Sequence, residues 1–321
     1  MEHILHMKGG VGETSYANNS SLQRKVIMKV KTIMEENLKL YMRNTTFNSS
    51  CKIADLGCSS GPNTLLSILN ILNIIHNIGF KLSNETPVIQ IYLNDLFGND
   101  FNTIFKLLPD FYKIIEQERG DNIRECFINA TPGNFYGRIF PKNYINFFHS
   151  SYCLHWLSQS RFEELASSGM MVLTFLSREM MYEITSCEVL STVLNEMFQE
   201  GLVEEEKLDM FDLPIYYPTI KEVRQVIMEE GSFTLQNLKT FKIGWDANLQ
   251  EDIDDCVLDN KMRGEFIAKY HRAIFEPLLI VEFDENIVDE IFSRFAKLIA
   301  KLLELESLEF TNIVLFVTKD P

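Results

Sequence analysis

Hydrophobic residues in this chain recur in two patterns, short continuous runs and longer stretches with helical spacing. The short runs have the length of strands and end in polar or small residues, which is typical of buried strands. We expect strands near residues 51–56, 88–94, 126–130, 145–150 and 170–176. Stretches with helical spacing separate them. This alternation predicts a doubly wound α/β sheet.

The second half of the chain is predominantly helical in pattern. The expected helices span residues 189–197, 221–228, 264–275 and 287–305. Two more strand-like runs, 233–241 and 310–318, interrupt and follow them. We therefore expect an α/β core over residues 1–180, completed by these two strands, and a mainly helical cap over residues 181–309.

A glycine loop follows the first expected strand. Asp55 lies two residues before Gly57, and Gly61 comes four residues after Gly57, ahead of an apolar helix at 65–78. Glycines let a backbone approach a ligand closely. A dinucleotide loop has the spacing G-x-G-x-x-G, and its middle glycine is missing here. The spacing found favours S-adenosylmethionine, with Asp55 facing the ammonium of the methionyl end.

A second acid ends the second expected strand. Asp95 closes the apolar run 88–95, and an acid in this position typically holds the ribose hydroxyls of a nucleoside. Open α/β sheets bind ligands at the carboxyl ends of their strands. Asp55 and Asp95 together therefore predict a nucleoside site at this edge of the sheet.

Several ordered blocks of the chain match a known family. They are residues 5–10, 13–20, 53–63, 93–101, 132–138 and 149–159. In this order they resemble the plant SABATH methyltransferases, which methylate small acids such as salicylate, benzoate and jasmonate, or nitrogens of xanthine alkaloids. The resemblance covers nearly the whole chain. It implies a Rossmann-like class I methyltransferase sheet with an α-helical cap, and S-adenosyl-L-methionine as cofactor.

The resemblance also implies a set of cofactor-binding residues. They are Tyr16, Ser20, Asp55, Gly57, Asn63, Asp95, Leu96, Asn134 and Phe135. Asn134 and Phe135 are expected beside the adenine. Relatives usually carry serine at position 134, and asparagine can hydrogen-bond the same edge. Core packing is the alternative role for Phe135.

Gln23 and Trp156 are the expected catalytic residues. An amide and an indole both offer a neutral N–H donor, and two such donors converging on one point can hold a carboxylate. The resemblance assigns the same pair to the substrate carboxyl group. The other expected substrate-binding residues are Tyr16, Tyr152, His155, Cys187, His271, Ile274 and Phe310.

The expected pocket differs from one made for salicylate. His155 stands where salicylate-specific relatives carry methionine, although a histidine between apolar neighbours is often simply part of the core. Cys187 lies where some relatives place tryptophan. Together with His271, these positions predict a roomier and more polar pocket.

Methyl transfer to a carboxylate needs no general base, because a carboxyl group is ionised at neutral pH. Catalysis then rests mostly on proximity and alignment. We expect the methyl ester of a small plant acid as product. The alternative is an N-methyltransferase for xanthines, with His155 or Tyr152 orienting the ring. A nicotinamide dehydrogenase and a catalytically silent binding protein are further alternatives.

Composition limits the other possibilities. The chain of 321 residues has a net charge of −15 and no cluster of basic residues, so nucleic acid is not an expected partner. Its six cysteines form no C-x-x-C pair, as in a reduced cytoplasmic protein. Neither a signal peptide nor an apolar run of membrane-spanning length is evident. We expect no metal ion, and by resemblance a homodimer.

The chain departs from the family in two places. Relatives carry a longer segment between the Leu-Ser-Gln block and the strand near Met170, and another after Arg178. Here Gln159 passes almost directly to residues 162–165, and Arg178 to residues 180–181. Either the protein is truncated at these two places, or mobile loops over the site are missing from this sequence, and we expect missing loops.

Overall fold

The structure is a computed structural model that describes residues 7–10, 12–42, 50–79, 88–119, 126–153, 159–179, 183–249 and 259–319. The chain divides into two compact units, each assembled from separate stretches. Unit 1 comprises Met1–Lys25, Arg178–Tyr217 and Lys242–Thr311. Unit 2 comprises Val26–Ser177, Pro218–Phe241 and Asn312–Pro321. The division near residue 180 stays a prediction.

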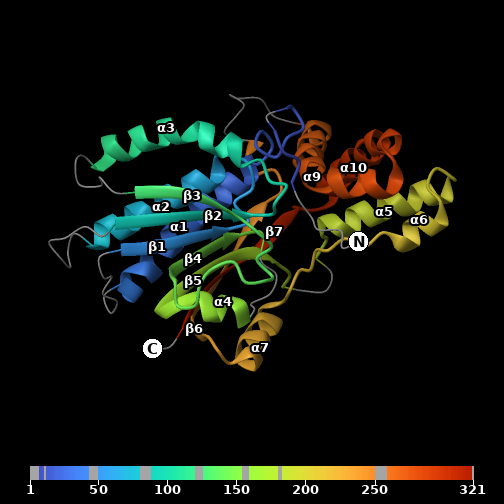
Figure 1. Ribbon diagram of the computed structural model, residues 1–321. Helices are drawn as coiled ribbons and strands as arrows, with labels where there is room; N and C mark the ends of the chain where they lie inside the picture. Colours follow the sequence, from blue (N-terminus) through green and yellow to red (C-terminus); the bar gives the residue numbers. More distant parts are fainter. Residues whose placement is uncertain are drawn as a thin grey trace. The chain divides into compact units, whose positions relative to one another are not determined.

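One seven-stranded sheet runs in the order β3-β2-β1-β4-β5-β7-β6 (Figure 1). Its strands are β1 (Ser50–Leu56), β2 (Val88–Asp95), β3 (Cys126–Pro132), β4 (Ile145–Ser151), β5 (Leu165–Ser177), β6 (Thr234–Gly244) and β7 (Glu309–Thr318). The first five pair with one another in parallel. Every strand expected from the sequence is present, and the α/β class is confirmed.

Helices account for most of the remaining described residues. They are α1 (Ser21–Met42), α2 (Asn63–Gly79), α3 (Phe101–Arg119), α4 (Gln159–Glu164), α5 (Ser186–Gln199), α6 (Glu205–Met210), α7 (Ile220–Glu230), α9 (Asn260–Phe283) and α10 (Glu285–Leu305). In the described part of the chain, no helix is both long enough and apolar enough to cross a membrane.

The central strands are fully buried, which explains their continuous apolar runs. Ile53, Ala54 and Leu56 of β1 are inaccessible to solvent, and so is Phe148 of the adjacent β4. A parallel strand covered on both faces shows no alternation of polar and apolar residues. Burial of this core fixes the register, so Asp55 pairs with Leu93 on one side and His149 on the other.

Strand β5 begins five residues earlier than the sequence predicts. Its pairing with β4 shifts register between Ile145 and Phe147, and the extra residues end at Gly169. A Cβ on Gly169 would lie 2.7 Å from the side chain of Leu165. Such a close internal contact is typical of a bulge, which an apolar-run pattern does not reveal.

In unit 1, helices α9 and α10 pack very closely. A Cβ on Gly264 of α9 would lie 2.4 Å from the backbone oxygen of Ala296 and 3.1 Å from the nitrogen of Ala300. These atoms belong to the backbone of α10 and cannot move aside cheaply. Gly264 therefore sets the distance between the two longest helices of this unit.

We predict that Gly264→Ala destabilises the protein by about 1–3 kcal/mol, as overpacking of a filled interface does. Urea unfolding measures this free energy. The matched control is Gly12→Ala, because nothing lies within 4 Å of the Cβ position at Gly12. Equal unfolding free energies for the two variants would contradict the close packing of α9 against α10.

Candidate active site

The glycine loop turns sharply at the end of β1. Gly57 has a φ of +74°, a conformation that side chains strongly disfavour. Its amide and that of Cys58 both donate to the backbone oxygen of Asn94, at 2.9 and 3.0 Å. A Cβ at Gly57 would lie 2.3 Å from the sulfur of Cys153. The turn is therefore accessible only to glycine.

Asp55 is held rigidly just before this turn. Its carboxylate accepts a hydrogen bond from the hydroxyl of Thr64 at 2.6 Å and lies 2.7 Å from Nδ1 of His149. Asp55 and His149 are each 4% exposed. The sequence analysis does not single out His149. Its position opposite Asp55 follows only from the register of the neighbouring strand.

Asp95 is more accessible than Asp55 and is held differently. Its two carboxylate oxygens accept backbone N–H groups, one from Ser59 at 2.7 Å and one from Leu96 at 2.8 Å. The amide of Asn99 donates to the oxygen of Ser59 at 2.8 Å. Asp95 therefore fastens the glycine loop to the end of β2 and still reaches the surface.

The loop after β3, residues 133–140, lies beside the glycine loop. The backbone N–H of Gly133 donates to the oxygen of Asp95 at 2.8 Å. Within the loop, the side-chain oxygen of Asn134 accepts the N–H of Tyr136 at 3.0 Å. The ring of Phe135 reaches to 3.8 Å from the Cβ position of Gly57. Unit 2 thus brings Asp55, Gly57, Asp95 and this loop to one edge of the sheet.

The residues present fit S-adenosylmethionine. The side-chain hydroxyls of Ser59 and Ser60 are buried without a hydrogen-bond partner among the described residues. Buried polar groups are normally satisfied, so two orphaned hydroxyls in the loop suit a polar ligand. Asn63, the first residue of α2, is half-buried at the end of the same loop.

Tyr152 follows β4 in an unusual backbone conformation. Its φ is +61°, which is strained for a bulky residue. Its N–H donates to the oxygen of Thr174 at 2.7 Å, and its hydroxyl donates to the side-chain oxygen of Asn312. Those bonds hold the chain immediately before residues 154–158. His155 and Trp156 belong to that segment and lie outside the described residues.

In unit 1, the N-terminal arm is fastened to α9. The backbone N–H of Lys8 donates to the oxygen of Ala273 at 3.3 Å, and the Lys8 ammonium pairs with Glu276 at 2.8 Å. The N–H of half-buried Tyr16 donates to the oxygen of Lys8 at 2.9 Å. The arm then reaches Ser20, which is buried just before α1.

Gln23 lies in the first turns of α1 and is buried. Its side-chain oxygen has no hydrogen-bond partner among the described residues. The nearby segment after β6 is tied to the same helix, since the amide of Asn248 donates to Ser21 at its start and Lys25 donates to the oxygen of Ala247. The side-chain oxygen of Asn248 is also unsatisfied.

An aromatic cluster surrounds His271 on α9. The ring of Trp245 stacks on Phe310 with a centroid distance of 4.8 Å, and the His271 ring lies 5.5 Å from Trp245 and 4.3 Å from Tyr270. Nδ1 of His271 bonds the oxygen of Ile267 at 2.9 Å. Burial lowers the pKa of His271 to about 4, so the imidazole is neutral at pH 7.

Trp245 was missed from the sequence. It is fully buried, and its indole N–H has no hydrogen-bond partner in the described part of the chain. A buried indole N–H normally finds an acceptor. The signal was available, because Trp245 is one of only two tryptophans in the chain.

The other two expected residues of this unit have separate surroundings. Cys187, at the start of α5, lies 3.9 Å from the hydroxyl of Tyr217, and burial raises its pKa to about 11. It is therefore a packing residue rather than a reactive thiolate. Ile274 is half-buried on α9, next to Phe275 of the aromatic cluster.

A family model described as SAM dependent carboxyl methyltransferase matches residues 2–161 and 159–320 of the chain. The protein belongs to this family, the SABATH methyltransferases. The resemblance stated from the sequence is thus confirmed, and this SABATH enzyme is a methyltransferase that depends on S-adenosylmethionine.

Known relatives cover the whole chain. A probable caffeine synthase of Coffea canephora is 38% identical over 378 residues, covering 100% of this chain and 98% of its own. A 3,7-dimethylxanthine N-methyltransferase of Coffea arabica has the same identity and coverage. Among solved structures, loganic acid methyltransferase with SAH is 26% identical and has a TM-score of 0.79, covering 98% of this chain and 99% of its own.

The SABATH enzyme is shorter than these relatives at an internal position. The Coffea canephora match spans 378 positions, whereas this chain has 321 residues. The two ranges of the family model meet at residues 159–161. This break lies at the first of the two places where the sequence departs from the family.

We predict that Gly57→Ala in this SABATH enzyme lowers the affinity for S-adenosylhomocysteine by about tenfold or more, because a side chain at this position displaces the loop. A loss of about 1.4 kcal/mol in binding free energy already corresponds to a tenfold loss of affinity. Calorimetric titration measures it. Gly98→Ala is the control, since nothing lies within 4 Å of that Cβ position. Wild-type affinity in Gly57→Ala would remove the glycine loop from the cofactor site.

We also predict that acid destabilises the folded enzyme through His271. Its pKa is 6.5 when exposed and about 4 when folded, so the unfolded chain binds the proton first. Stability therefore falls as pH drops from 6.5 toward 4, by about 3 kcal/mol in full. Urea unfolding at pH 7 and pH 5 measures this. In His271→Leu the loss between the two pH values should shrink.

The control for His271→Leu is Phe275→Leu. Phe275 lies in the same cluster, 5.7 Å from the His271 ring, but carries no titrating group. It should lower stability equally at both pH values. An unchanged pH dependence in His271→Leu would show that protonation of this histidine does not limit stability in acid.

Proposed function

We propose that this enzyme methylates the carboxylate of a small organic acid and forms its methyl ester. The supporting observation is Trp245 in unit 1, whose buried and neutral indole N–H has no hydrogen-bond partner among the described residues. Neutral groups can hold a carboxylate without neutralising it, and a strong cation would weaken its nucleophilicity. The description of the family model, a carboxyl methyltransferase, supports the same reaction.

The state of His271 supports a reaction without a general base. An N–H of a xanthine must lose its proton during methylation, whereas a carboxylate has none to lose. A histidine whose pKa lies near 4 is a weak base at neutral pH. In this proposal the neutral His271, which packs beside Phe310, helps to shape the substrate site without acting as a base, and Ile274 is a further contact.

S-Adenosylmethionine supplies an electrophilic methyl group on its sulfonium. We infer that Asp95 binds the ribose hydroxyls, because its carboxylate is accessible. Asp55 keeps the methionyl end in place together with the loop hydroxyls. Asn134 offers its amide N–H to the adenine edge, since its oxygen is already bonded to Tyr136. Tyr16, Ser20, Asn63, Leu96 and Phe135 complete the cofactor site in this proposal.

On the acceptor side, Gln23 and Trp156 remain the proposed grip on the carboxylate. Tyr152, His155 and Cys187 are the other proposed contacts. These residues need to lower the activation free energy mainly by aligning the substrate, because alignment alone accounts for up to about 7–11 kcal/mol in well-oriented systems. Homodimer formation and a cytoplasmic location stay predictions.

N-methylation of a xanthine is the second candidate. It is favoured by the names of the Coffea relatives, which are 38% identical to this chain. Both candidates use the same cofactor site. They differ in whether the accepting atom carries a proton and a charge.

Methyl transfer from labelled S-adenosylmethionine to a panel of acids and xanthines tests the proposal. The panel contains salicylate, benzoate, jasmonate, indole acetate, nicotinate and xanthines. Label that is extractable and released by mild base is a methyl ester, the expected product. Base-stable label on a xanthine would overturn the proposal in favour of the second candidate.

We predict that Gln23→Leu lowers kcat/KM for the acid by about 10- to 100-fold, because a hydrogen bond to a charged group is worth about 1.5–3 kcal/mol. Gln23→Glu should lower it further through repulsion of the carboxylate. Affinity for S-adenosylhomocysteine, measured by calorimetry, should stay near wild type in both. If Gln23→Glu is no worse than Gln23→Leu, the substrate does not present a carboxylate to Gln23.

A further inference from the structure

A buried ion pair on the short helix α4 has no part in the chemistry described above. Nη2 of Arg161 lies 2.8 Å from Oε2 of Glu164, and their side chains are 1% and 0% exposed. Burial lowers the pKa of Arg161 and raises the pKa of Glu164. Taking two charges out of water is costly, so the other contacts of the pair are informative.

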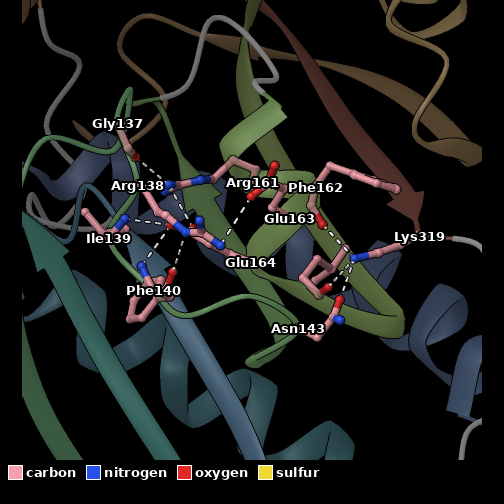
Figure 2. Close-up of polar contacts among 11 residues, drawn as sticks. Gly137, Arg138, Ile139, Phe140, Asn143, Arg161, Phe162, Glu163, Glu164 and Lys319 are labelled. Atoms are coloured by element: carbon pink, nitrogen blue, oxygen red, sulfur yellow. Dashed lines mark hydrogen bonds and ion pairs between the residues drawn. The ribbon is translucent and has the colours of Figure 1, made fainter.

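The side-chain hydrogen bonds of the pair all reach one short segment (Figure 2). Oε1 of Glu164 accepts the backbone N–H groups of Ile139 at 2.6 Å and Phe140 at 2.8 Å. Nη2 of Arg161 donates to the backbone oxygen of Gly137 at 2.6 Å. Three main-chain groups of the 133–140 loop are therefore bonded to this single ion pair.

The 133–140 loop is thereby held at both ends. At its beginning, Gly133 donates to the oxygen of Asp95, and the amide of Asn94 donates to the oxygen of Gly133 at 3.0 Å. At its end the ion pair holds the backbone. Asn134 and Phe135 lie between the two anchors, so their place is set by both.

A second anchor of α4 is independent of the loop. The ammonium of Lys319 donates to the backbone oxygens of Phe162 and Leu165, both at 2.9 Å, and to the side chain of Asn143 at 2.7 Å (Figure 2). It makes none of the contacts to residues 137–140 that the ion pair makes. Lys319 can thus be altered to loosen α4 without removing the bonds to the loop.

The guanidinium of Arg161 leaves part of its hydrogen-bonding capacity unused. Its Nε and Nη1 are buried without hydrogen-bond partners among the described residues, and the group lies over the ring of Phe148 at 5.7 Å. Its one side-chain hydrogen bond runs from Nη2 to Gly137, and the same nitrogen forms the ion pair with Glu164. Burying a charged group with unpaired N–H donors costs free energy, and its remaining hydrogen bond holds one loop. This arrangement fits a positioning role.

We propose that Arg161 and Glu164 are positioning residues that hold the adenine end of the cofactor site through the backbone of the 133–140 loop. This inference rests on the proposed function, in which Asn134 and Phe135 meet the adenine. It assigns a role in cofactor recognition to a helix that directly precedes β5 and that touches no reacting atom.

Binding of two ligands that differ only at the purine tests the proposal. Calorimetry compares S-adenosylhomocysteine with S-inosylhomocysteine, in whose purine N1 carries a hydrogen and can no longer accept an amide N–H. In Glu164→Gln we expect affinity for the adenosyl ligand to fall roughly tenfold, as small misplacements of positioned groups do. Affinity for the inosyl ligand should fall less, so the ratio between the two ligands approaches that of Asn134→Ala.

Arg161→Lys provides the conservative companion, since it keeps the charge and one donor. Its ratio of adenosyl to inosyl affinity should lie between the ratios of the wild type and of Glu164→Gln. In the double variant with Asn134→Ala, Glu164→Gln should add little to the loss of adenosyl affinity, because both act on the same contact. If Glu164→Gln does not fold, Glu164→Asp takes its place in every measurement.

Lys319→Met is the matched control for stability. It removes the second anchor of α4 and should lower the unfolding free energy while leaving the ratio of affinities at the wild-type value. A ratio that falls equally in Lys319→Met would mean that general loosening of α4 explains the effect, and the positioning role would be wrong.

Different results would overturn the adenine assignment and the positioning role. If Asn134→Ala leaves the affinity ratio unchanged, the adenine assignment within the proposed function is wrong and this inference falls with it. If Asn134→Ala lowers the ratio but Glu164→Gln and Arg161→Lys do not, only the positioning role is overturned. Neither result depends on which acid or xanthine the enzyme methylates.

Discussion

The turn at Gly57 is the constraint on which the cofactor side of this enzyme depends. Its positive φ is compatible with glycine, and the sulfur of Cys153 leaves no room for a side chain there. Around it, backbone groups and buried side chains fasten three successive strand ends to one another. Asp55 is tied to α2 and β4, and Asp95 is tied to the loop itself. The loop is consequently fixed before a ligand arrives, which reduces the entropy that binding must overcome.

Unit 1 contributes a different kind of surface. The indole N–H of Trp245 is buried without a hydrogen-bond partner among the described residues, and burial keeps the nearby His271 ring neutral. Aromatic rings surround His271. These groups offer shape and weak polarity rather than strong charge. Substrate choice would then depend on packing more than on charge.

The short connection between β4 and β5 gives α4 an importance that its length does not suggest. Parallel neighbouring strands need a crossover of about a dozen residues or more, and here residues 152–164 make the whole connection. The short helix is stabilised by its own ion pair, by Lys319 and by the backbone bonds of Asn143 and Tyr144. Because Arg161 and Glu164 also bond the 133–140 loop, this short connection and that loop share one support.

The sequence by itself determined the sheet, the glycine loop and the family. These follow from local patterns, since continuous apolar runs, a D-x-G spacing and ordered motif blocks are read directly along the chain. Only the tertiary structure decided which groups meet across strands. His149 beside Asp55, Trp245 on Phe310, and Arg161 with Glu164 under the 133–140 loop join positions distant in the chain. Strand register and burial create these contacts, and neither leaves a local signal in the sequence.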